Sequence, residues 1–455
     1  MGTIQTLGYG FAWNTSALVI GKIITFANLF IILTHLTVYE YGLTELTFSV
    51  VSTVSLFMLP GLVSTITADL AVERGKGNFG AMKALFLEFF LFSLAVGILA
   101  WGILFFGSSF VAHLTGNDLI DRFFKIVAFL FLVAPWRIAT TMLATVMVRY
   151  ADQSFFSVVE EGAKGLFLCV FFFALGRGAD GLLFAAVCAQ LTAVLLFLPR
   201  TLSAYRTFSY ATGVVMQPLW MLLREHRKWS VASSYMGTLV QNVRLWLIKV
   251  LLGTEAVGMF AFAFGILGHL GSVLPVTALI TPLVPSFVDK RIELVRLVRA
   301  SIKLQLAIAL TLSLTVVLLG NVLVEYFFPK YLATLPLIDV ILISFIISSV
   351  ASPLTPVFTA FREQKTLFLS HTVKMVIMLV TLPIMTYFFG LVGVGLELAL
   401  TVLGNAIERF YRFKKILPEF TFGPRDLISL DGHERHVIRT IFQGIKSHAA
   451  RVTNF

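Results

Sequence analysis

Four basic residues lie deep inside long hydrophobic stretches of the sequence: Lys22, Arg137, Arg244 and Lys374. A charge at the centre of a bilayer costs at least about 2.5–3.5 kcal/mol on insertion scales, so each group needs water or an anionic partner. The acidic residues lie in connecting segments or toward the ends of the hydrophobic stretches. The charge at mid-depth is therefore predicted to be positive. Arginine offers phosphate a two-pronged fork and lysine a point charge, so the pattern predicts a site for a phosphate-bearing anion.

Lys22 and Arg244 are the strongest candidates for this anion site. Lys22 lies about eleven residues from each end of its hydrophobic stretch, far from either membrane interface. Arg244 follows Gln241 by three residues, which places both on nearly the same face of a helix. We therefore expect Lys22, Arg244 and Gln241 to line a hydrated cavity.

Two interpretations remain open for each of the other two cations. Lys374 follows His371 by three residues and could instead extend to the cytoplasmic interface. Arg137 lies beside Pro135 and could instead bind backbone carbonyls that the proline leaves without a hydrogen bond. Both remain candidates for the cavity.

The segments that must position these residues are membrane-spanning helices. The chain has 455 residues, of which 58% are hydrophobic and only 13% charged, against about 25% charged in a soluble protein. Hydrophobic stretches long enough to cross a bilayer core of about 30 Å recur along the whole chain. The sequence predicts an all-α polytopic membrane protein with twelve spans: 11–34, 41–66, 84–108, 122–148, 155–176, 181–199, 229–252, 257–287, 301–328, 335–360, 367–389 and 391–412.

The distribution of lysine and arginine predicts the orientation of the spans. Most basic residues outside the spans lie in the even-numbered loops and after Arg409, which places both termini in the cytoplasm. The net charge of +11 then reflects topology and contact with anionic membrane lipids, and we expect no nucleic-acid partner.

The sequence also contains an internal repeat of about half its length. Trp13, Gly21 and Gly42 match Trp229, Gly237 and Gly258 at a separation of 216 residues; Gln153 matches Gln364, and Gly176 matches Gly390. The pattern predicts two pseudo-symmetric six-helix lobes, 1–212 and 213–415, followed by a cytoplasmic amphipathic tail, 416–455. In this repeat Arg244 corresponds to Asn28, which we therefore add as a polar residue of the cavity.

Several short motifs indicate a family. The stretch "LTVYEYGL" after the first span, "PGL" near the end of the second, "RYADQ" after the fourth and the glycine-rich turn "GRGADG" resemble the polysaccharide transporter, or Wzx-type flippase, branch of the MOP (MATE-like) superfamily. The resemblance implies a V-shaped pair of lobes that moves an oligosaccharide linked to polyprenyl phosphate or pyrophosphate across the cytoplasmic membrane by alternating access. It implies a role in cell-surface polysaccharide biosynthesis, with a glycan polymerase or glycosyltransferases as partners.

Two other function classes remain as alternatives. A MATE-type drug or cation exporter would need a carboxylate within the membrane to bind its coupling ion, and the first span contains Lys22 and no acidic residue. An enzyme of surface glycans would need a catalytic motif, and the sequence contains no nucleotide-binding loop, nucleophile elbow or metal-binding cluster. We therefore expect a transporter without enzymatic activity, cofactor or metal.

Overall fold

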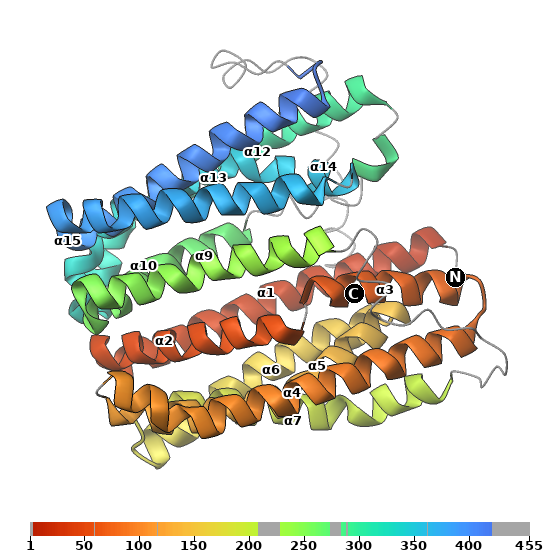
Figure 1. Ribbon diagram of the computed structural model, residues 1–455, viewed down its shortest axis with the longest axis horizontal. Helices are drawn as coiled ribbons and strands as arrows, with labels where there is room; N and C mark the ends of the chain where they lie inside the picture. Colours follow the sequence, from red (N-terminus) through yellow and green to blue (C-terminus); the bar gives the residue numbers. More distant parts are fainter. Residues whose placement is uncertain are drawn as a thin grey trace, which may run out of the picture. The chain divides into compact units, whose positions relative to one another are not determined.

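The computed structural model describes residues 3–58, 60–115, 117–207, 228–273, 284–287, 290–361 and 363–420, and these residues form helices and short connections without any strand (Figure 1). The chain divides into two compact units, Met1–Thr238 and Leu239–Phe455. The boundary falls within one long helix, α9 (Lys228–Leu252). The predicted division near residue 212 and most of the predicted tail lie outside the described residues.

Among the described residues, the first unit contains seven α-helices before α9. They are α1 (Thr3–His35), α2 (Val38–Ser55), α3 (Pro60–Gly75), α4 (Phe79–Thr115), α5 (Asp118–Val146), α6 (Tyr150–Cys169) and α7 (Ala179–Arg206). The main packing pairs are α4 with α5, α1 with α6, and α7 with both α5 and α6. Short segments of other helix types, η1 (Leu56–Met58) and η2 (Val170–Ala174), follow α2 and α6.

The second unit is built in the same manner from the second half of α9 onward. It contains α10 (Thr254–Val273), η3 (Val284–Phe287), α12 (Arg291–Phe327), η4 (Pro329–Thr334), α13 (Leu335–Ala351), η5 (Ser352–Leu354), α14 (Thr355–Ala360) and α15 (Gln364–Ile416). Here α12 packs on α13, as α4 packs on α5, and α13 packs on α15, as α5 packs on α7.

Helix α2 begins where the sequence supplies a cap. Thr37 accepts a hydrogen bond from the backbone N–H of Glu40 at 3.2 Å, and the Glu40 carboxylate accepts one from the backbone N–H of Thr37 at 2.9 Å. This capping box lies in the "LTVYEYGL" motif and is worth about 0.5–2 kcal/mol. The motif therefore has a local structural role at the start of α2.

The predicted spans fall on helices of the structure, with differences at breaks. Within the described residues, eight helices are long and apolar enough to cross a membrane, and Val19–His35 is a shorter apolar segment. The predicted span 41–66 is divided between α2, η1 and α3, and 335–360 between α13, η5 and α14. Residues 274–283 of the predicted span 257–287 lie outside the described residues. The outer faces carry exposed large apolar residues such as Phe106, Val250 and Tyr387, as lipid contact requires.

Backbone geometry supports the internal repeat. Gly176, between α6 and α7, has a φ of +61°, and Gly390, inside α15, has a φ of +55°. Only glycine adopts such angles without strain. Gly42 and Gly258, also matched in the repeat, are both buried in the first turns of α2 and α10.

Candidate functional site

The second unit contains a polar cavity of about 230 Å³. Its walls come from α9, α10, α13 and both halves of α15. Five of the lining residues are apolar, and six are polar or charged: Gln241, Arg244, Ser344, Ser348, Lys374 and Thr401. Ser344 and Ser348 donate to backbone carbonyls of α13 at 2.6 and 2.9 Å, so their oxygens can still accept hydrogen bonds from a ligand.

Arg244 forms a two-pronged ion pair with Glu397 on the second half of α15. Its Nε donates to Glu397 Oε2 at 2.9 Å and its Nη2 to Glu397 Oε1 at 3.1 Å. The Thr401 hydroxyl donates to Glu397 Oε1 at 2.6 Å. The side chains of Arg244 and Glu397 are 2% and 0% exposed, so water screens their attraction very little.

The turn at Gly390 is what brings the two halves of α15 to one cavity. Residues before it and after it are helical, whereas Gly390 itself has a φ of +55° and a ψ of −132°. A Cβ on Gly393 would lie 2.0 Å from the carbonyl oxygen of Met385, so the chain reverses through a very close backbone approach. Further along, a Cβ on Gly404 would lie 2.6 Å from Ile377, which shows that the two halves lie side by side (Figure 1). Lys374 thus shares the cavity with Thr401.

Lys374 gives this cavity its surplus charge. It is half-buried, and within the described part of the chain it forms no ion pair. It interacts electrostatically with Arg244 and with Arg409. The formal charges of Arg244, Lys374 and Glu397 sum to +1, so the cavity favours an anion over a cation.

The first unit holds the other predicted residues, around α1, α5 and α6. Asn28 is 3% exposed and donates its amide N–H to the backbone oxygen of Glu161 at 2.9 Å and to its carboxylate at 3.2 Å. A Cβ on Gly165 would lie 2.6 Å from Asn28 Oδ1, so this glycine allows the two helices to approach. Lys22 is half-buried and, among the described residues, forms no ion pair.

Arg137 pairs with a carboxylate, which differs from both interpretations of the sequence. Its Nε lies 3.1 and 3.2 Å from the two carboxylate oxygens of Glu160. Pro135 has no backbone N–H and so cannot donate the helical hydrogen bond to the carbonyl oxygen of Phe131. A Cβ on Gly97 of α4 would lie 2.5 Å from that oxygen. The proline therefore creates a packing site for Gly97 and α4.

The expectation that acidic residues avoid the middle of the helices is wrong. Glu160 and Glu161 lie about ten residues into α6, with Lys164 one turn further, and Glu397 lies well inside α15. As a result Arg244 and Arg137 are both paired with acids. A signal was available, because the stretch "SVVEEGAKGLF" falls inside the predicted span 155–176.

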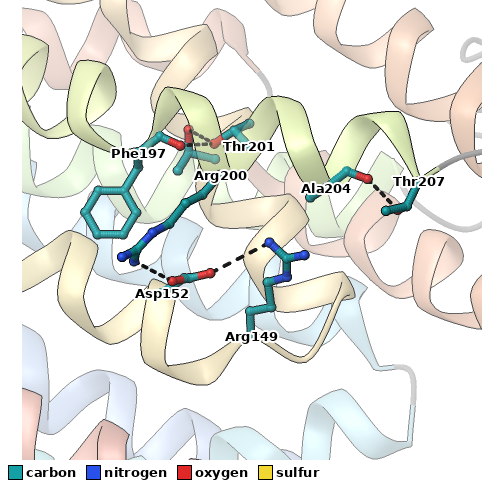
Figure 2. Close-up of polar contacts among 8 residues, drawn as sticks. Arg149, Asp152, Phe197, Arg200, Thr201, Ala204 and Thr207 are labelled. Carbon is teal, nitrogen blue, oxygen red and sulfur yellow. Dashed lines mark hydrogen bonds and ion pairs between the residues drawn. The ribbon is translucent and has the colours of Figure 1, made fainter.

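The "RYADQ" motif forms an ion-pair bridge at the start of α6. Asp152 lies between Arg149, at 4.0 Å, and Arg200 of α7, at 2.7 Å (Figure 2). The Arg200 guanidinium also lies 5.3 Å from the centre of the Phe197 ring. The bridge ties α6 to α7 and is largely exposed at Arg200, so its role is structural.

The structure thus brings together three of the predicted site residues. Gln241, Arg244 and Lys374 line the cavity of the second unit. Lys22, Arg137 and Asn28 belong to the first unit and do not line that cavity. Glu397, Thr401, Ser344 and Ser348 were not predicted. Within the described residues, no group of three or more His, Cys, Asp or Glu side chains could hold a metal ion.

Comparisons with known proteins place the chain in a family. Residues 32–336 match the family model Polysacc_synt_3, described as polysaccharide biosynthesis protein. No curated protein matches the sequence.

Solved structures with the same fold are transporters of low sequence identity. An inward-facing multidrug resistance MATE family transporter of the MOP superfamily is 13% identical, with a TM-score of 0.72 over 89% of this chain and 95% of that one. An outward-facing one is 14% identical, with a TM-score of 0.71 over 92% and 99%.

A MOP superfamily transporter from Pyrococcus furiosus Vc1 (DSM3638), for which reverse polarity of the binding pocket suggests a different function, is 13% identical, with a TM-score of 0.69 over 93% and 99%. The family match covers well over half of the chain, and the structural matches cover nearly all of it. The chain therefore belongs to the polysaccharide biosynthesis protein family and is a multi-pass membrane protein with the fold of MOP superfamily transporters.

Proposed function

We propose that this protein moves an oligosaccharide linked to polyprenyl phosphate or pyrophosphate across the cytoplasmic membrane by alternating access, for cell-surface polysaccharide biosynthesis. The observation that carries the proposal is the cavity of the second unit, with Arg244 and Lys374 on its wall and a net charge of +1. The membership of a polysaccharide biosynthesis family supports a glycan substrate.

The cavity suits the phosphate-bearing headgroup rather than the whole substrate. Its volume of about 230 Å³ lies below the range of about 300–1,000 Å³ that drug-sized ligands occupy. Lys374 would supply a point charge to the phosphate, and Arg244 a planar guanidinium. Ser344, Ser348 and Gln241 would bind ester oxygens or the first sugar hydroxyls. The glycan would occupy hydrated space, and the polyprenyl chain would remain in lipid.

Lys22 remains a candidate for the same headgroup in the first unit. It lies on α1 in the middle of its hydrophobic stretch and forms no ion pair among the described residues. Arg137 is a weaker candidate, because Glu160 already balances its charge.

The alternative is a MATE-type drug or cation exporter. The carboxylates inside α6 favour it, since membrane-embedded acids can bind cations or protons. However, Glu160 is paired with Arg137, and the Glu161 carboxylate accepts a hydrogen bond from Asn28. The positive cavity of the second unit also disfavours a cationic substrate.

The proposal is tested by measuring lipid-linked oligosaccharide on each membrane leaflet in cells that lack this protein. We expect the intermediate to accumulate on the cytoplasmic side and wild-type protein to clear it. Lys374→Met should clear it at least tenfold more slowly, because this change removes a cation without leaving a buried acid unpaired. Arg244→Lys and Lys22→Ala test the other two cations.

Lys249→Ala is the matched control for these variants. Lys249 is a cation in the last turn of α9, 4.9 Å from the centre of the Trp246 ring, and does not line the cavity. Its removal should leave clearance unchanged at equal protein level. Equal clearance by wild type and all cation variants would disprove the site. If no lipid-linked intermediate changes when the protein is absent, the flippase proposal fails and cation export becomes the leading function.

A further inference from the structure

Glu397 occupies the part of Arg244 that a phosphate group would use. A guanidinium binds phosphate most strongly through two parallel N–H groups, as it binds a carboxylate. Both Nε and Nη2 of Arg244 already donate to Glu397, at 2.9 and 3.1 Å. A phosphate that takes this edge must therefore share it with the carboxylate or displace it.

Sharing the edge brings two anions together in a place that water hardly reaches. The Glu397 side chain is 0% exposed. Two acidic groups that share a buried site cannot both remain ionised at low cost, and one of them takes a proton. A diphosphate that entered a cavity of net charge +1 would leave an excess of negative charge, which uptake of a proton reduces.

We propose that Glu397 takes up one proton when a phosphate-bearing headgroup binds to Arg244, so that headgroup binding and proton uptake are coupled at this pair. The inference rests on the proposed function, because it names the coupling ion of the same cavity. A proton supplied by the buffered solvent binds to a carboxylate oxygen of Glu397, and the two Arg244 N–H groups transfer their hydrogen bonds from Glu397 to phosphate oxygens. Nothing is oxidised or reduced, and release of the headgroup returns the proton.

Thr401 provides the connection between the cavity and the carboxyl group. Its side chain lines the cavity, and its hydroxyl donates to Glu397 Oε1 at 2.6 Å. A hydroxyl can donate and accept at once, so it can pass a proton from cavity water to Glu397. The carboxyl group is therefore buried but not isolated from the site.

The positions and partners of the other charged groups identify Glu397 as the acid of this cavity. Among the described residues, the titratable groups on the packed elements, besides Glu397 itself, are Lys228, Tyr235, Arg244 and Lys249 on α9; Glu255 and His269 on α10; Asp339 on α13; and Lys365, His371, Lys374, Tyr387, Glu408, Arg409, Tyr411, Arg412, Lys414 and Lys415 on α15. Glu255 and Asp339 are exposed. Glu408 is paired with Arg412 and accepts a hydrogen bond from Ser370. His371 interacts electrostatically with Lys374 and Arg409.

The test measures proton uptake during binding of farnesyl pyrophosphate to the full-length protein in detergent. Calorimetric titrations at pH 7.5 in buffers of different ionisation enthalpy yield the number of protons taken up per bound ligand. We expect the wild-type protein to take up about one proton more than Glu397→Gln, whose amide keeps the shape but cannot titrate. Between pH 7.5 and 8.5, wild-type affinity should fall about tenfold relative to that of Glu397→Gln.

Comparison with the variant removes the contribution of the ligand's own ionisation, whose last step for a phosphate ester lies near pH 6. Glu408→Gln is the matched control, because Glu408 is also an arginine-paired acid on α15 and does not line the cavity. The Glu408→Gln variant should take up as many protons per bound ligand as the wild-type protein. Equal uptake by wild type and Glu397→Gln overturns the inference and leaves the proposed function standing. Absence of farnesyl pyrophosphate binding by the wild-type protein contradicts the proposed function itself.

Discussion

Arg244 and Glu397 lie 153 residues apart in the sequence and form a pair that is almost wholly buried. Removing each ion from water costs several kcal/mol, and this cost is offset only when the geometry of the pair is good and further hydrogen bonds form. Here both oxygens of the carboxylate accept from Arg244, and Thr401 supplies a third hydrogen bond. Such pairs add little net stability, but loss of one partner leaves the other as a buried charge without a counter-charge. The pair is therefore better explained by a role in the cavity than by a contribution to stability.

This reasoning predicts an unequal effect of single and double substitutions. Glu397→Ala should lower the free energy of unfolding by about 3–5 kcal/mol, because Arg244 is left buried without its counter-charge. The double variant Arg244→Leu with Glu397→Leu should lose clearly less. Thermal unfolding of the purified protein in detergent would show the difference. A double variant that is less stable than the single one would contradict the interpretation.

Asn28 and Arg244, which correspond in the repeat, make related contacts in their two units. Both are buried, and each bonds to a glutamate: Asn28 to Glu161 on α6, and Arg244 to Glu397 on α15. Each therefore ties the first helix of its half to a later helix. Asn28 is neutral and leaves the first unit without a charge at this position, whereas Arg244 contributes one.

At the scale of helices, glycines decide where chains reverse and where neighbours approach. The two halves of α15 enter one cavity only because Gly390 adopts a φ of +55° with a ψ of −132°. An L-residue with a Cβ is strained at these angles by about 1–3 kcal/mol. Its counterpart Gly176 serves the same purpose between α6 and α7.

Gly390→Ala should therefore reduce stability by about 1–3 kcal/mol and disturb the cavity, because Lys374 and Glu397 lie on opposite sides of the turn. Gly320→Ala on α12 is the control: its Cβ would meet Val316 at an ordinary 3.6 Å, and alanine favours the helix. Gly320→Ala should be neutral or stabilising by up to about 1 kcal/mol. Thermal unfolding of both variants tests the comparison, and equal losses would count against the turn as the cause.

For the whole molecule, the exposed surface of the helices is the surface of a membrane protein. Large apolar side chains such as Tyr326, Phe106 and Val250 are more than 70% exposed, which only a lipid environment tolerates over so many helices. The basic residues concentrate in alternate loops and in the chain after Arg409. Their distribution predicts that both termini lie in the cytoplasm.

The orientation can be tested with an epitope fused after Phe455. In intact spheroplasts the epitope should resist externally added protease, and it should be cleaved once the membrane is made permeable. An epitope inserted after Asn117, in the connection between α4 and α5, should behave in the opposite way. Cleavage of the C-terminal epitope in intact spheroplasts would invert the predicted topology.

Much of the helical architecture could be predicted because it depends on local properties of the chain. A run of about 20 apolar residues must form a helix in lipid, since no water is present to bond its backbone. The positions of Gly176 and Gly390 in the repeat likewise predicted two matching turns, and both have positive φ. Breaks within helices also have a local signal, because α3 begins at Pro60 soon after η1 and η5 contains Pro353, and proline lacks the N–H that continues a helix.

The sequence by itself determined the membrane helices, the repeat and the identity of the cations deep within it, because hydrophobicity and charge are properties of single residues and short segments. Tertiary structure alone decided which charges meet. Arg244 has Glu397 as its partner because the chain reverses at Gly390, so that the two halves of α15 lie side by side. Arg137 has Glu160 as its partner because α5 and α6 are neighbours. The energy of a buried charge depends on atoms within a few ångströms, so only the folded chain could show that Arg244 is paired with an acid whereas Lys374 has no ion pair among the residues that the structure describes.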